Sequence, residues 1–83
     1  MIYKYSLVEI VWDDACSESG WCYVEDTKLQ PQHCYTVGFL IAENRNHLII
    51  GHTHDGNDGF VGWFQIPKRM IVSRKTLKRA RKG

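Results

Sequence analysis

Three strand-forming segments follow one another between residues 34 and 66, with only short polar turns between them. CYTVGFLIAE (34–43), HLIIGHTH (47–54) and FVGWFQI (60–66) are rich in β-branched and aromatic residues, which favour strands. ENRN (43–46) and DGNDG (55–59) separate them. The Asp-Gly pair and Asn of the second turn supply the positive φ that tight hairpins need. This succession predicts an antiparallel β protein.

Two further strands flank this central part. In IYKYSLVEIVW (2–12) the apolar residues that share one parity are Ile2, Val8, Ile10 and Trp12, which predicts the first strand. Pro67 has no N–H for a ladder, so we expect it to end the fourth strand. PKRM (67–70) then forms one helical turn and MIVSR (70–74) a short fifth strand. Gly62 predicts a bulge or a close backbone approach within the fourth strand.

The chain holds one domain at most, because it has 83 residues. DDACSESGW (13–21) breaks the strand pattern, and VEDTKLQPQ (24–32) fits one helical turn or an irregular excursion. We therefore expect an all-β, five-stranded, strongly bent antiparallel barrel over residues 1–77, with a long first loop and a basic tail over 78–83. Closing the sheet would remove edges that so small a chain cannot otherwise cover.

The net charge of +2 hides a strong asymmetry. Residues 1–58 hold all nine acidic residues and three basic ones, a net charge of −6, whereas residues 59–83 hold eight basic residues and no acid, a net charge of +8. A cluster of bases with no neighbouring acid favours phosphate groups. The candidate ligand-binding residues are Lys68, Arg69, Arg74, Lys75, Lys78 and Arg79. Phe60, Trp63 and Phe64 lie just upstream and would stack on bases if they faced solvent.

GWFQIPKRMIVS (62–73) resembles the end of the SH3-like and Sm-like small barrels, where a strand finishes, a proline opens the turn and an apolar residue returns to the core. The resemblance implies a small five-stranded barrel with a long irregular loop after its first strand, and barrels of this type often assemble edge to edge. The paired aromatic residues with which SH3 domains grip proline-rich peptides, and the N-terminal helix and Asp/Asn pattern of RNA-reading Sm proteins, have no counterpart in the chain.

VEIVWDDACSESGW (8–21), YTVGFLIAE (35–43) and QIPKRMIVS (65–73) are together similar to a group of short bacteriophage and prophage proteins of unassigned function. The similarity implies a bacterial cytoplasm during infection and a non-essential or host-directed role. It supplies no catalytic residues.

Several side chains invite a metal or a catalytic interpretation. His52 and His54 are two apart on a strand and would share a face, but turn chemistry explains GHTHDGNDG (51–59) equally well. Cys16 and Cys22 are wider apart than the usual zinc spacing, and His33 and Cys34 are strand neighbours that point to opposite faces. Asp13, Asp14 and Glu18 share a loop. We expect the thiols to be small packed side chains, and no metal or cofactor.

The leading hypothesis is a non-enzymatic barrel that binds RNA, DNA or a nucleotide through its basic C-terminal side. As a homo-oligomer it would hold ligand between subunits and sequester a nucleotide signal of host defence. One alternative is a protein inhibitor whose acidic loop, residues 13–26, engages a basic host protein. Another is a metal-dependent hydrolase at His52 and His54. No apolar run approaches the ~20 residues of a membrane helix, and residues 1–12 lack signal-peptide features, so we expect a cytoplasmic protein with reduced thiols.

Overall fold

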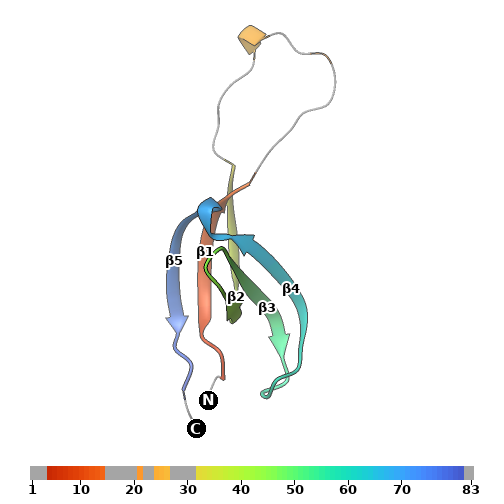
Figure 1. Ribbon diagram of the computed structural model, residues 1–83, viewed down its shortest axis with the longest axis vertical. Helices are drawn as coiled ribbons and strands as arrows, with labels where there is room; N and C mark the ends of the chain where they lie inside the picture. The colour runs from red at the N-terminus through yellow and green to blue at the C-terminus, as the bar shows by residue number, and fades with distance from the viewer. Residues whose placement is uncertain (1–3, 15–20, 22–23, 27–31, 82–83) are drawn as a thin grey trace.

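The described residues form one antiparallel sheet of five strands. The computed structural model describes residues 4–14, 21, 24–26 and 32–81, and Figure 1 shows their arrangement. The strands are β1 (Leu7–Asp13), β2 (His33–Glu43), β3 (His47–His54), β4 (Phe60–Pro67) and β5 (Ile71–Lys78), with 3-10 turns η1 (Val24–Asp26) and η2 (Lys68–Met70). The prediction of an all-β fold with a helical turn before the last strand is confirmed. No helix in these ranges is long and apolar enough to cross a membrane.

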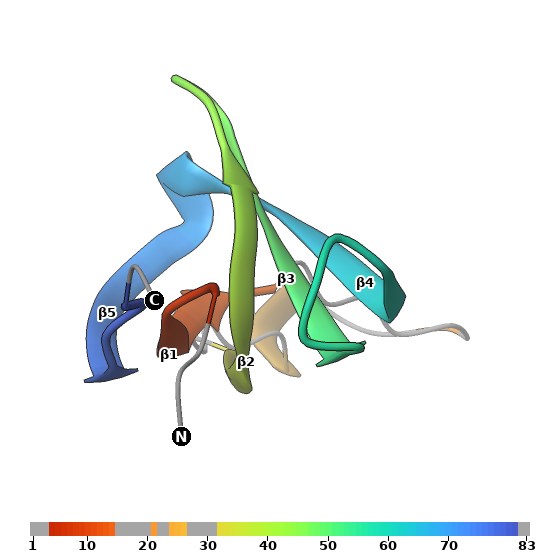
Figure 2. The same cartoon turned by 90° about the horizontal axis from the view of Figure 1, so that it is seen from below.

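The predicted closure of the sheet is wrong. The strand order is β4-β3-β2-β1-β5, so β4 and β5 each have one neighbour among the described strands. Figures 1 and 2 place these two strands on opposite sides of a strongly bent sheet, joined by η2 across one end. The reason lies in the connection. Pro67 ends β4, and the single turn of η2 redirects the chain to pair with β1 instead of returning along β4.

A small apolar core joins side chains of β1, β3 and β4. Its buried members are Val8, Ile10, Trp12, Leu48, Ile50 and Ile66. The alternation predicted for the first strand is confirmed for the three β1 residues, while Ile2 lies outside the described residues. The indole N–H of Trp12 donates to Thr36 Oγ1 at 3.0 Å, and the ring packs 5.3 Å from that of Phe64. The polar end of this large side chain is therefore satisfied within the core.

The first and last strands along the chain differ in length from the prediction. β1 begins at Leu7, and β5 continues to Lys78 where the sequence pattern predicted an end at Arg74.

At Gly62 the register with β3 continues without a shift, so there is no bulge at this position. Its φ is 73°, and a Cβ there would lie 3.1 Å from the Cβ of His52. The close approach is confirmed, and the register shifts of the sheet fall elsewhere: in β2 between Leu40 and Ala42, and in the β1–β5 pair between Leu7 and Val8 and between Val11 and Trp12.

Candidate basic pocket at one end of the sheet

The structure spreads the six basic residues predicted as a site along one side of the molecule. Lys68 and Arg69 lie in η2, Arg74, Lys75 and Lys78 lie in β5, and Arg79 follows it. β5 spans roughly 23 Å at about 3.3 Å per residue, so Lys78 and Arg79 lie far from the η2 pair. These residues do not converge on one point, and any single site must be sought at one end.

Glu43 forms ion pairs with two of these six basic residues. Its carboxylate lies 2.6 Å from Lys68 Nζ and accepts two hydrogen bonds from the Arg74 guanidinium, at 3.0 and 3.4 Å. Hydrogen bonds from Arg74 and then Lys68 lower the pKa of Glu43 to about 2. Much of the positive charge of these two side chains is therefore compensated inside the protein.

The remaining charge of η2 faces a pocket at the same end of the sheet. A half-open hollow of about 480 Å³ is lined by Arg45, Asn46, His47, Pro67, Lys68 and Arg69. This volume lies within the range of small-molecule sites. The lining contains three residues that carry a positive charge, one histidine and no acid, so its chemistry suits an anion.

Backbone contacts fix the two walls of this pocket. The side-chain oxygen of Asn44 accepts hydrogen bonds from the N–H groups of Asn46 and His47, at 2.9 and 2.8 Å, which shapes the β2–β3 turn. The N–H of Lys68 donates to the carbonyl of Asn46 at 2.8 Å. This bond ties η2 to the hairpin turn, so the two basic segments keep a fixed spacing.

The two arginines of the pocket are available to a ligand. Arg45 and Arg69 are exposed, and neither takes part in an ion pair within the part of the chain that the structure describes. A guanidinium presents a planar fork of N–H donors that fits phosphate oxygens. Arg45 and Arg69 thus bring two such donor groups to the lining of one pocket.

An exposed indole lies on the same face of the sheet. His47 pairs with Pro67, and Gly51 with Trp63, in an unbroken register, so alternate residues of β4 from 63 to 67 share that face. A smaller hollow of about 110 Å³, lined in part by Ile49 and Gln65, also includes His47. Trp63 is 62% exposed and lies about 13 Å along the strand from Pro67. The face therefore offers a stacking surface at one end and cations at the other.

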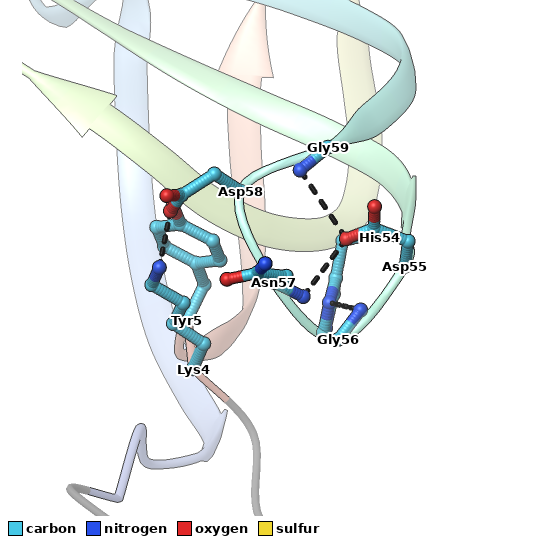
Figure 3. Close-up of polar contacts among 8 residues, drawn as sticks. All are labelled: Lys4, Tyr5, His54, Asp55, Gly56, Asn57, Asp58 and Gly59. Atoms are coloured by element: carbon cyan, nitrogen blue, oxygen red, sulfur yellow. Dashed lines mark hydrogen bonds and ion pairs between the residues drawn. The ribbon is translucent and has the colours of Figure 1, made fainter.

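The turn with the two histidines is held by its own hydrogen bonds. Figure 3 shows His54 Nδ1 accepting from the N–H of Gly56 at 2.9 Å, and Asp55 Oδ1 accepting from Asn57 and Gly59 at 2.8 and 3.2 Å. Asp58 faces Lys4 and Tyr5. The interpretation of residues 51–59 as a strand end and hairpin is confirmed.

His54 and Asp55, two of the side chains considered as metal ligands, are engaged in contacts within the protein. The ring of His54 packs against those of Tyr5 and Phe39. Within the described ranges, no three His, Cys, Asp or Glu side chains lie close enough to hold an ion. His52 lies beside Gly62, and among the residues that the structure describes no contact joins it to a second candidate ligand.

Only some of the cysteines and acidic residues considered as metal ligands or as a protein-binding loop lie among the described residues. Cys34 packs against the core, whereas His33 pairs with Asp13, so the prediction that these neighbours point apart is confirmed. Cys16, Cys22 and Glu18 lie outside the described residues, as does most of the acidic loop 13–26.

Sequence reasoning missed Arg45, Asn46 and His47. Arg45 was counted with the acidic part of the chain, although the hairpin at 55–59 already places residue 47 opposite residue 67.

Comparison with protein-family models, with curated proteins and with solved structures found no match to this chain.

Proposed function

We propose that the protein is a non-enzymatic binding module for a phosphate-bearing ligand, either single-stranded nucleic acid or a nucleotide. The observation that carries the proposal is the basic pocket with two exposed arginines, no acid in its lining and a volume of about 480 Å³. As part of this proposal, the open five-stranded sheet is a member of the SH3-like/Sm-like small barrels. A phage origin and the sequestering of a host-defence signal belong to it as well.

The charges support a phosphate in the pocket. Arg45 and Arg69 donate to phosphate oxygens, and Lys68 adds positive charge that Glu43 shares. His47 lines the same cavity and, in either tautomer, has one N–H to donate. A nucleotide base then extends along the sheet face toward Trp63, where an exposed indole offers its ring for stacking.

The other predicted ligand residues act at longer range in this proposal. Lys75, Lys78 and Arg79 are exposed and have no acidic partner among the described ion pairs. Their field attracts a polyanion to this side of the molecule, and it is screened over about 10 Å at 0.1 M salt. Their contribution should therefore be strongly salt dependent.

The test uses fluorescein-labelled oligothymidine and ATP as probes, measured by fluorescence anisotropy and by calorimetry. Arg69→Ala removes one charge inside the pocket, and Arg81→Ala removes one charge outside it. We expect Arg69→Ala to weaken binding about ten-fold, as the loss of a charge-assisted contact does, and Arg81→Ala to weaken it by less than about two-fold. Arg45→Ala should resemble Arg69→Ala.

Equal effects of the pocket variants and Arg81→Ala would show that only diffuse charge attracts the probe, and would overturn the pocket assignment. No binding of either probe to the wild-type protein would overturn the function itself. A deletion of residues 79–83 tests the tail without shortening β5, which a deletion from residue 75 would truncate.

A further inference from the structure

The edge strand β4 carries an unusual amount of exposed apolar surface. It has one neighbouring strand in the described sheet, so the backbone groups on its other side point away from the ladder. Four of its large side chains are exposed: Phe60 (39%), Val61 (70%), Trp63 (62%) and Phe64 (46%). Long, apolar edge strands pair readily with another strand unless something blocks them.

The two edges of the sheet differ in how they are protected. β5 exposes Val72 and Leu77, but it also carries Arg74, Lys75 and Lys78, and charged side chains on an edge oppose pairing with another copy. The sequence of β4, FVGWFQIP, contains no charged residue. Self-pairing is thus opposed by like charges at β5 and by none at β4.

Charges flank β4 in a way that selects its orientation. Asp55 and Asp58 precede the strand, and Lys68 and Arg69 follow it. The Asp58 side chain is 77% exposed, and Arg69 is exposed. In an antiparallel pair of β4 strands, the acidic turn of each copy faces the basic η2 of the other, whereas a parallel pair would bring like charges together.

We propose that β4 is the docking strand for a second copy of this chain, with the two β4 strands paired antiparallel about a twofold axis. A positive φ of 73° at Gly62 interrupts the extended backbone, so the axis passes near Phe64. In that register, Asp58 and Gly59 of one copy lie opposite Met70 and Arg69 of the other. A twofold contact of one surface with itself is the commonest closed arrangement of soluble oligomers. The inference does not rest on the proposed function.

The test is the oligomeric state of the full chain, measured by light scattering and native mass spectrometry from about 1 to 100 µM, a range typical of weak dimers. Val61→Lys and Trp63→Lys each place a charge on the β4 edge at a side chain exposed in the single copy. Val72→Lys is the matched control, because it adds the same charge to β5 at a residue that is 55% exposed. We expect a dimer for the wild type and Val72→Lys, and a monomer for both β4 variants.

A wild type that stays monomeric across the range would overturn the proposal. So would a β4 variant that remains dimeric, or a larger assembly that Val72→Lys disrupts, since that result points to β5. Amide hydrogen exchange of the wild-type protein tests the same contact without any substitution. Amides of β4 should become more protected as the concentration rises, and protection that appears only elsewhere would contradict the inference.

Discussion

At the scale of single residues, Glu43 links the end of β2 to both η2 and β5. It lies between Lys68 and Arg74, which are 25 and 31 positions away in the sequence. One carboxylate with two cationic donors forms a small network, and networks contribute more than isolated surface pairs. Glu43 therefore holds the turn that bears the basic pocket against the strand that follows it.

Glu43→Gln should lower the free energy of unfolding at pH 7 by about 1 kcal/mol, the upper end for an exposed pair. The pKa of Glu43 falls from 4.5 to about 2 on folding. Between these values the unfolded state binds more protons, so the stabilisation is complete above the unfolded pKa and disappears as the pH falls through the folded one. Urea unfolding at several pH values measures this difference. Glu25→Gln, at an exposed carboxylate in η1, should show no such difference at any pH.

The pocket residues illustrate which side chains a sequence can assign to a site. Lys68 and Arg69 stood out because they belong to a basic run. Arg45 stands alone between two asparagines, and only the hairpin register brings it beside η2. The compensation of Lys68 and Arg74 by Glu43 was not predictable either, because it joins segments whose spacing depends on the bent sheet.

At the scale of elements, the strands with strong turn signals at both ends were predicted best. β3 matches its predicted range from His47 to His54, because polar turns bound it on either side. β5 was predicted too short, since its basic residues were read as a tail. In the structure these residues form a strand because β1 supplies a neighbour for their backbone, a contact that local composition does not encode.

The turn between β3 and β4 depends on the backbone of Gly56. Its φ is 86°, and a Cβ would meet nothing within 4 Å. Gly56→Ala should therefore cost about 1 kcal/mol through backbone strain alone, and Gly56→Asn should cost less because asparagine tolerates this conformation. Chemical denaturation of the two variants measures the difference. Equal stability of wild type, Ala and Asn variants would mean that the turn does not hold this φ in solution.

At the scale of the whole molecule, the sheet is open, which the sequence did not predict. The prediction of a closed barrel assumed that a small chain must hide its own edges. In the structure, η2 separates β4 from β5, and β5 carries the charges that protect an edge, whereas β4 has none. If a second copy covers β4, the edge is protected between molecules and no closure within one chain is needed.

The two proposals meet at Arg69, which lines the basic pocket and, in the dimer, faces the acidic turn of the other copy. Phosphate and this turn then compete for one cation, and such coupling is reciprocal. Val61→Lys should therefore bind ATP more tightly than Val72→Lys at concentrations where the latter is dimeric. The two variants carry equal charge, so net electrostatics cancels in the comparison. ATP should also shift the wild type toward monomer in native mass spectrometry. Tighter ATP binding by the dimeric Val72→Lys would instead mean that the partner's turn leaves Arg69 accessible and that the paired sheets complete the site.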